Sequence, residues 1–141
     1  MALQLPIGEE AEFQGVIDLL GGVAMVYPDG GRRGGSGDAP RVEPIPADYE
    51  EEYEIYRQRM IEKIVETDES LLIRYLEGED IDADDLRRAL RRATIERSLV
   101  PVLCGSATTS KGVHPSMSSP SRYRIKSDSS VSTIFSIIRW R

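Results

Sequence analysis

A pair of glycines between two apolar runs is the feature that most constrains the fold of this chain. Gly21 and Gly22 separate residues 16–20 (VIDLL) from residues 23–27 (VAMVY). Two β-prone runs joined by glycines predict an antiparallel hairpin, because glycine supplies the positive φ that a tight turn requires. A shorter apolar run at residues 3–7 (LQLPI) predicts another strand before the hairpin.

Residues 28–46 are rich in glycine and proline and predict a loop, because little in them is available to bury against the entropy of ordering. The GGRRGG stretch within them is conceivable as a phosphate cradle. Its spacing matches neither the Walker pattern nor the dinucleotide fingerprint, and no strand-to-helix context surrounds it. We therefore interpret it as a flexible insert.

Three helices are predicted after this loop. Residues 47–66 form the first, with an apolar stripe of Tyr53, Tyr56, Met60 and Ile64 at spacings of three and four. Thr67 and Asp68 end it, and Asp68 caps a short second helix that ends at Gly78. The apolar stripe of this second helix is Leu71, Leu72, Tyr75 and Leu76. Asp82 is expected to cap the third, whose apolar face is Leu86, Ala89, Leu90 and Ala93.

Acidic and basic residues occupy different parts of the third helix. Asp84 and Asp85 fall in its first turn, where the helix dipole favours acidic groups. Four arginines occupy the side opposite the apolar face: Arg87, Arg88, Arg91 and Arg92. Asp84 and Arg88 are placed to pair at i,i+4.

Residues 99–104 (LVPVLC) form a near-continuous apolar run, which predicts a strand covered on both faces with Pro101 near its start. Gly105, Ser106 and Ala107 follow it directly. A strand that ends in a small-residue turn presents backbone N–H groups to a ligand at the sheet edge. One such N–H can donate to a carbonyl such as O6 of guanine, and it would meet the adenine amino group as a like donor. Alone, this three-residue signal is weak, because Gly-Ser-Ala after a strand is far more often a plain turn.

Several stretches together resemble bacterial-type elongation factor G. They are LQLPIG, FQGVIDLL, EPIPADYEEE, ETDESLLIRYLEGEDI, LRRALRRATI and VPVLCGSATTSKGVHP, in this order, and they cover roughly residues 2–115. The resemblance implies an α/β fold: part of a P-loop GTPase-type sheet, its C-terminal strands, with an inserted α+β subdomain of a β-hairpin and three helices. Residues 1–115 would be a partial GTP-binding domain, with the insert at about 13–98 and the guanine-recognition strand and loop at 99–112.

The resemblance also implies a function. Elongation factor G hydrolyses GTP with Mg²⁺ and drives transfer RNA and messenger RNA through the ribosome in the cytoplasm. Gly105, Ser106 and Ala107 match the family's fifth guanine-nucleotide motif, with the Ala107 N–H facing the base oxygen and Ser106 shaping the loop.

Three acidic residues are implied to contact the ribosomal stalk protein. By position these are Glu62, Glu66 and Glu69. A solvated acidic helix face is the equally weighted alternative. DNA and membranes are not expected partners.

The motifs that grip the triphosphate are missing from this sequence. Neither G-x-x-x-x-G-K-[ST] nor Asn-Lys-x-Asp occurs, and His114 does not match the family's catalytic histidine. No catalytic or metal-ligating residue is therefore assigned, and the chain alone is expected neither to bind nor to hydrolyse GTP. One alternative is a nucleotide-independent module that binds the stalk protein. Another is a related translational GTPase, such as a ribosomal-protection or release factor.

Charge divides the chain at about residue 112. Residues 1–112 carry 13 Lys or Arg and 23 Asp or Glu. Residues 113–141 carry five Lys or Arg and one Asp, and the net charge of the whole chain is −6. We interpret residues 116–141, which are rich in serine, as an aberrant, disordered or out-of-frame tail; a natural basic tail for RNA or membrane contact is the alternative. The single cysteine, Cys104, excludes an internal disulfide and is expected to be a buried, inert thiol. Neither a signal peptide nor a membrane-spanning run is evident, so a cytoplasmic protein is expected.

Overall fold

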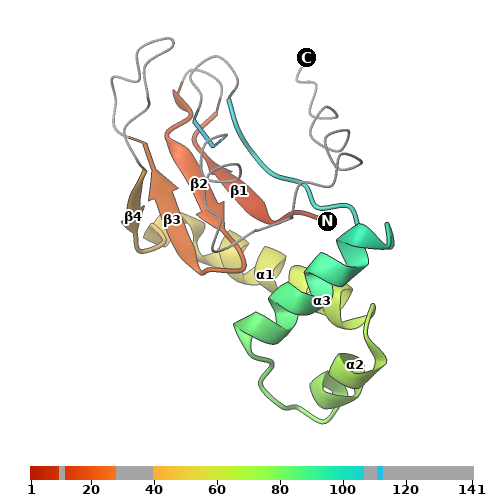
Figure 1. Cartoon of the computed structure of the whole chain (residues 1–141). Coiled ribbons are helices and arrows are strands. Elements are labelled where there is room, and N and C mark those ends of the chain that lie inside the picture. Colours follow the sequence, from red (N-terminus) through yellow and green to blue (C-terminus); the bar gives the residue numbers. More distant parts are fainter. Residues whose placement is uncertain (10–11, 28–39, 107–110, 113–141) are drawn as a thin grey trace.

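The computed structural model describes residues 1–9, 12–27, 40–106 and 111–112. Its sheet contains four antiparallel strands in sequential order, β1 (Gln4–Ile7), β2 (Gly15–Asp18), β3 (Val23–Val26) and β4 (Arg41–Glu43). Figure 1 shows this sheet on one side of the molecule and the helices on the other. The architecture is mixed α/β, as predicted.

The predicted hairpin is formed by β2 and β3, with Asp18 opposite Val23. Its turn is longer than predicted, because Leu19 and Leu20 belong to the turn rather than to the strand. The buried Asp18 carboxylate explains this difference, since its Oδ1 accepts hydrogen bonds from the amides of Leu20 (3.0 Å) and Gly21 (3.1 Å). These bonds stabilise the turn in place of ladder bonds.

Strand β4 corrects the prediction of a continuous loop over residues 28–46. Arg41, Val42 and Glu43 pair with β3, and all three are exposed. The pairing uses backbone groups alone, so the side chains show none of the alternation that predicts a half-buried strand. Residues 28–39, including the GGRRGG stretch, lie outside the described residues.

Three α-helices follow, as predicted. A 3₁₀ turn (Ala47–Tyr49) leads into α1 (Glu50–Val65), and α2 (Glu69–Leu76) and α3 (Ala83–Ile95) come next. Asp68 caps α2, with its side chain accepting hydrogen bonds from the Ser70 and Leu71 amides. Asp82 stands at the N-cap of α3, but its side chain makes no capping hydrogen bond.

The predicted pair between Asp84 and Arg88 is wrong. Asp84 instead pairs with Arg87 at 2.6 Å, and Arg88 pairs with Asp85. The Asp85 carboxylate also accepts from Arg74 of α2, at 2.9 Å. Both pairs on α3 therefore use i,i+3 spacing, and Asp85 joins the two helices.

The structure also corrects the prediction of a strand over residues 99–104. They form a single parallel bridge between Val102 and Ala2 rather than a strand covered on both faces. Val100 is 62% exposed and Val102 is 47% exposed. The segment pairs with the N-terminal residues, through Leu3 N to Val102 O at 3.0 Å and Val102 N to Met1 O at 2.8 Å. Pro101 interrupts further pairing because it has no N–H.

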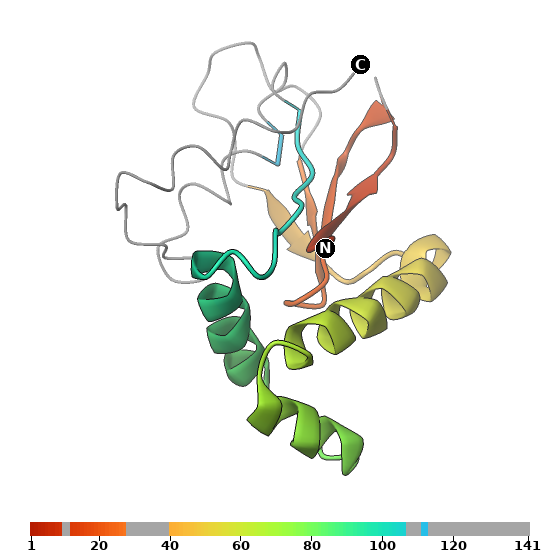
Figure 2. The same cartoon turned by 90° about the vertical axis from the view of Figure 1, so that its right-hand side faces the viewer.

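One core joins the sheet to the helices. Buried side chains from β1 and β2 belong to the same cluster as Met60 and Ile64 of α1 and Leu86 of α3. Figure 2 shows α1 and α3 converging below the sheet, with α2 farthest from it. The Arg57 guanidinium of α1 donates to the Leu19 carbonyl at 2.9 Å and ties this helix to the hairpin turn.

Candidate functional site

The loop after residues 99–104 begins at Gly105 and Ser106, which are both half-buried. The Ser106 amide donates to the Lys111 carbonyl at 2.8 Å, so residues 106 and 111 meet where the loop closes. Because this bond occupies the Ser106 N–H, that group is not available to a base. Ala107, to which the base contact is assigned, lies outside the described residues, as does His114.

Gly112 brings the chain back against the start of the loop. Its φ is +78°, and a Cβ added there would lie 2.5 Å from the Cys104 carbonyl oxygen and 2.8 Å from the Gly105 Cα. Both distances are shorter than real contacts allow. Only glycine therefore permits this close return.

Two hydrogen bonds hold the loop against the sheet and its β1–β2 connection. The Gln4 side chain of β1 accepts a hydrogen bond from the Cys104 amide at 3.2 Å. The Lys111 ammonium donates to the Phe13 carbonyl at 2.9 Å. At the end of β3, burial raises the pKa of the Tyr27 phenol, and the backbone of Gly112 opposes that rise. The loop is therefore attached to residues that precede it by up to 100 positions.

Cys104 is half-buried rather than fully buried. Desolvation raises the pKa of its thiol, so the thiolate is disfavoured at neutral pH. Its sulfur lies 3.5 Å from the Gln4 carbonyl oxygen. This environment agrees with the prediction of an inert thiol.

The described start of the loop carries small residues at positions 105 and 106. Among the described residues, no group of three or more His, Cys, Asp or Glu side chains could hold a metal ion.

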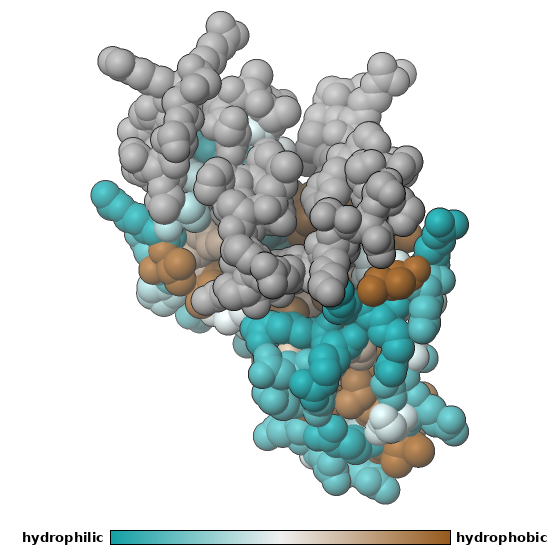
Figure 3. All heavy atoms as spheres, viewed as in Figure 1, coloured by the Kyte–Doolittle hydropathy of each residue, from teal (hydrophilic) through white to brown (hydrophobic). Residues whose placement is uncertain are grey.

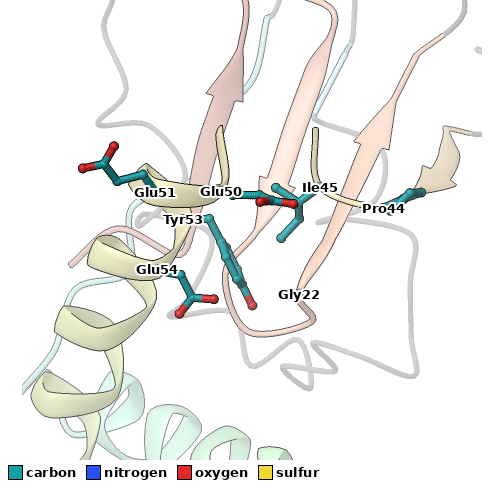
Figure 4. A pocket seen from close by; sticks show the side chains of 7 residues that line it. All are labelled: Gly22, Pro44, Ile45, Glu50, Glu51, Tyr53 and Glu54. Atoms are coloured by element: carbon teal, nitrogen blue, oxygen red, sulfur yellow. The ribbon is translucent and has the colours of Figure 1, made fainter. Parts of the chain in front are cut away.

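A separate hollow of about 430 Å³ lies between the β2–β3 turn and the start of α1 (Figure 4). Its lining residues are Gly22, Pro44, Ile45, Glu50, Glu51, Tyr53 and Glu54. The three carboxylates at its rim would repel a phosphate group. None of the described loop residues lines the hollow, so the two are separate.

The three acidic residues assigned to the stalk contact lie where α1 meets α2, and all are exposed. Glu62 accepts hydrogen bonds from Gln58 (3.1 Å) and from the Tyr75 hydroxyl (3.4 Å). Glu66 pairs with Lys63 at 2.7 Å, which raises the pKa of the Lys63 ammonium. Glu69 stands in the first turn of α2.

The structure does not bring the two sets of predicted residues together. The loop lies beside β1, whereas the acidic residues lie at the far end of α1 (Figure 1). Figure 3 shows the helical part as a largely hydrophilic surface with isolated apolar patches. The two features are therefore separate candidate sites.

Sequence reasoning missed the residues that support the loop. Gln4 and Lys111 act on it from outside the three-residue motif. Phe13 contributes a backbone carbonyl, which carries no side-chain signal. Lys111 is the one lysine of the VPVLCGSATTSKGVHP stretch and could have been singled out on that ground.

Comparison with known proteins identifies the family. The chain is 47% identical over 115 residues to elongation factor G of Aquifex pyrophilus, an alignment that covers 82% of this chain and 16% of that protein. The chain belongs to the elongation factor G family. It spans about one sixth of the length of that relative and corresponds to part of a translation elongation factor.

A solved structure supports the fold. A protein from Thermus thermophilus matches with a TM-score of 0.66 and 34% sequence identity, over 81% of this chain and 16% of that one. No protein-family model matches the chain. Among the described residues, no helix is long and apolar enough to cross a membrane.

Proposed function

We propose that residues 1–115 are part of the GTP-binding domain of a ribosomal translocation factor that hydrolyses GTP in the cytoplasm. In this proposal residues 99–112 recognise guanine, and the insert at about 13–98 contacts the ribosomal stalk. The observation that carries the proposal is the 47% identity to elongation factor G, which extends across both features.

Guanine recognition is supported by the architecture of the loop. Gly105 and Ser106 follow the segment that pairs with the N-terminus, and Ser106 and Lys111 close the turn. The adjoining amide of Ala107 would donate to O6 of guanine. An adenine amino group in the same place would leave a buried donor unpaired, which disfavours it.

A complete factor tests this role. Residues 2–115 of this chain would replace the aligned segment of an intact elongation factor G, and the affinities for GDP and ADP would be compared. We expect the hybrid protein to prefer GDP as strongly as its parent does. Equal affinities for the two nucleotides in a hybrid that is folded would contradict the assignment of the loop.

By itself the chain should not bind GTP measurably. One hydrogen bond to a base contributes on the order of 1 kcal/mol. Phosphate and Mg²⁺ contacts, whose motifs this sequence does not contain, supply most of the affinity in such proteins. Calorimetry with GTP and Mg²⁺ should show no heat of binding, and tight uptake or release of inorganic phosphate would refute the proposal.

The stalk contact is the second candidate function and does not depend on nucleotide. It is supported by the position of Glu62 in the last turn of α1 and of Glu66 at its C-cap. The helix dipole disfavours carboxylates at a C-terminus, so helix stability does not explain these residues. A basic partner surface would relieve the unfavourable charge.

Binding of the purified chain to the stalk protein's C-terminal domain tests this contact. We expect micromolar binding that is lost in the double variant Glu62→Lys and Glu66→Lys. The matched control is Glu51→Lys with Glu54→Lys, which makes the same change in net charge at the other end of α1. If both double variants weaken binding equally, only non-specific charge attraction is present, and the assignment fails.

A further inference from the structure

We propose that the free edge of β4 pairs with the same edge of a second copy of this chain, as two antiparallel strands related by a twofold axis at Val42. Strand β4 is the last strand of the sheet, and no other described strand pairs with its outer side (Figure 1). An unpaired strand edge is a template for pairing with another chain. This edge takes no part in the proposed contacts with guanine or with the stalk protein.

The register of the sheet fixes the direction of each backbone group in β3. The Tyr27 amide donates to the Gln14 carbonyl at 2.9 Å, so these two residues form a hydrogen-bonded pair. Such pairs alternate along an antiparallel ladder, and Met25 lies two residues before Tyr27 in the same ladder. Met25 therefore directs its N–H and C=O at β2, and the neighbouring Ala24 and Val26 direct theirs at β4.

The same alternation determines what β4 offers at its free edge. Arg41 and Glu43 lie opposite Val26 and Ala24, and their backbone groups bond to those residues. Val42, between them, directs its N–H and C=O away from β3. Two copies that meet at Val42 can therefore exchange a pair of backbone hydrogen bonds, as two strands of one sheet do.

The side chains of β4 are complementary to one another across such an axis. All three are exposed, and within the described part of the chain neither Arg41 nor Glu43 forms an ion pair. When the two Val42 residues face each other in antiparallel strands, each Arg41 faces a Glu43. Side chains approach most closely at such non-hydrogen-bonded positions, so two cross-strand ion pairs result. A parallel alignment would place like charges opposite each other.

The pairing is short and closes on itself. Pro44 follows β4 and has no N–H to donate, so the ladder ends there. Twofold pairing uses the free edge of both copies and therefore stops at two chains. Two backbone bonds and two exposed ion pairs bury little area, so the dissociation constant should be about 0.1–1 mM.

Sedimentation equilibrium of the full chain at increasing concentration measures the association. The apparent mass should rise from that of one chain toward that of two. Arg41→Glu and Glu43→Arg should each weaken the dimer by about tenfold, because each variant puts like charges opposite each other twice. The double variant, Arg41→Glu with Glu43→Arg, should restore the association, since it exchanges the charges and keeps their match.

The two single variants control for net charge. Arg41→Glu makes the acidic chain more negative, whereas Glu43→Arg makes it less negative. General repulsion between chains would therefore move the two dissociation constants in opposite directions. Only a local pairing of these two residues predicts that both variants weaken the dimer.

Val42→Pro tests the backbone hydrogen bonds. Proline removes the outward N–H, leaves the bonds between β4 and β3 in place and should abolish the dimer. Val42→Ala, which keeps the N–H, is the matched control. Slow exchange of the Val26 amide in both variants would show that β4 remains attached to β3, and if β4 detaches, the charge variants decide.

The outcomes distinguish this dimer from other uses of the edge. A single-chain mass at every concentration would overturn the proposal and leave the edge to an extended segment of another protein. Association that grows beyond two chains, or that the double charge variant does not restore, would also overturn it. So would a dimer that persists in Val42→Pro.

Discussion

The sheet and the outer helices are stabilised in different ways. All four residues of β2 are buried, whereas α2 buries only Leu71. Ion pairs also hold α2 in place, with Arg74 bonded to both Glu79 and Asp85 and Arg92 of α3 paired with Asp68. Burial of apolar area contributes far more per residue than an exposed ion pair does. We therefore expect the sheet to contribute more to the stability of the chain than α2 does.

The largest effect should come from a cavity in the sheet. Ile17 is fully buried in β2, so Ile17→Ala should lower the free energy of unfolding by about 2–4 kcal/mol. Urea denaturation followed by circular dichroism measures this change. Val42→Ala is the control, because Val42 is 63% exposed and its truncation should have little effect. Similar losses in both variants would show that the sheet is not the main source of stability.

A smaller and more local effect is expected in the outer helices. Leu71 is the buried residue of α2 and is 6% exposed, so Leu71→Ala should cost about 2 kcal/mol. Amide exchange should rise in α2 while β2 stays protected, because the cavity lies at the end of the core. A uniform rise in both elements would mean that sheet and helices unfold as one unit.

The cap of α2 should make this region sensitive to acid. The Ser70 side chain, with the Leu71 amide and Arg92, lowers the pKa of the Asp68 carboxyl to about 2. Because this value is below that of the unfolded chain, the stabilisation is present above about pH 4 and is lost as pH falls toward 2. Asp68→Ala should cost about 1 kcal/mol at neutral pH.

Thermal unfolding at pH 7, 4, 3 and 2 checks this effect. Asp68→Ala should differ from the parent chain at pH 7 and approach it at pH 2. A difference that stays constant over this range would show that the carboxylate charge is not the stabilising feature.

The smallest effect is expected from an exposed ion pair. Asp84 is 66% exposed and pairs with Arg87 on the surface of α3. Asp84→Asn should change the free energy of unfolding by no more than about 0.5 kcal/mol. If Asp84→Asn lowered the free energy of unfolding by more than Asp68→Ala does, exposed ion pairs would not be weaker than helix caps and buried contacts, as expected here.

Most of the secondary structure could be predicted because its signals are local. The glycine pair marked the hairpin, and the apolar spacing of Tyr53, Tyr56, Met60 and Ile64 marked α1. Strand β4 was missed because its exposed residues have no apolar alternation. Residues 99–104 were predicted to be covered on both faces, since an apolar run does not reveal what packs against it.

The motifs of the candidate sites could be predicted from the sequence, but the contacts that hold the loop in place could not. Gly105 and Ser106 could be identified from their place after an apolar run and from the family resemblance. The contacts of Cys104 with Gln4 and of Lys111 with Phe13 join residues about 100 positions apart. Such pairings leave no periodic signal in a single sequence.

The sequence by itself determined the hairpin, the three helices, the cap of α2 and the family to which the chain belongs. These properties depend on neighbouring residues or on the identity of long motifs. Only the tertiary structure decided that the loop at 105–112 is attached to the β1–β2 connection, and that the acidic end of α1 lies apart from it. The physical reason is that the sheet brings distant backbone groups within hydrogen-bonding distance. Every residue carries a backbone carbonyl, so the sequence does not reveal that the carbonyl of Phe13 will accept a hydrogen bond from Lys111.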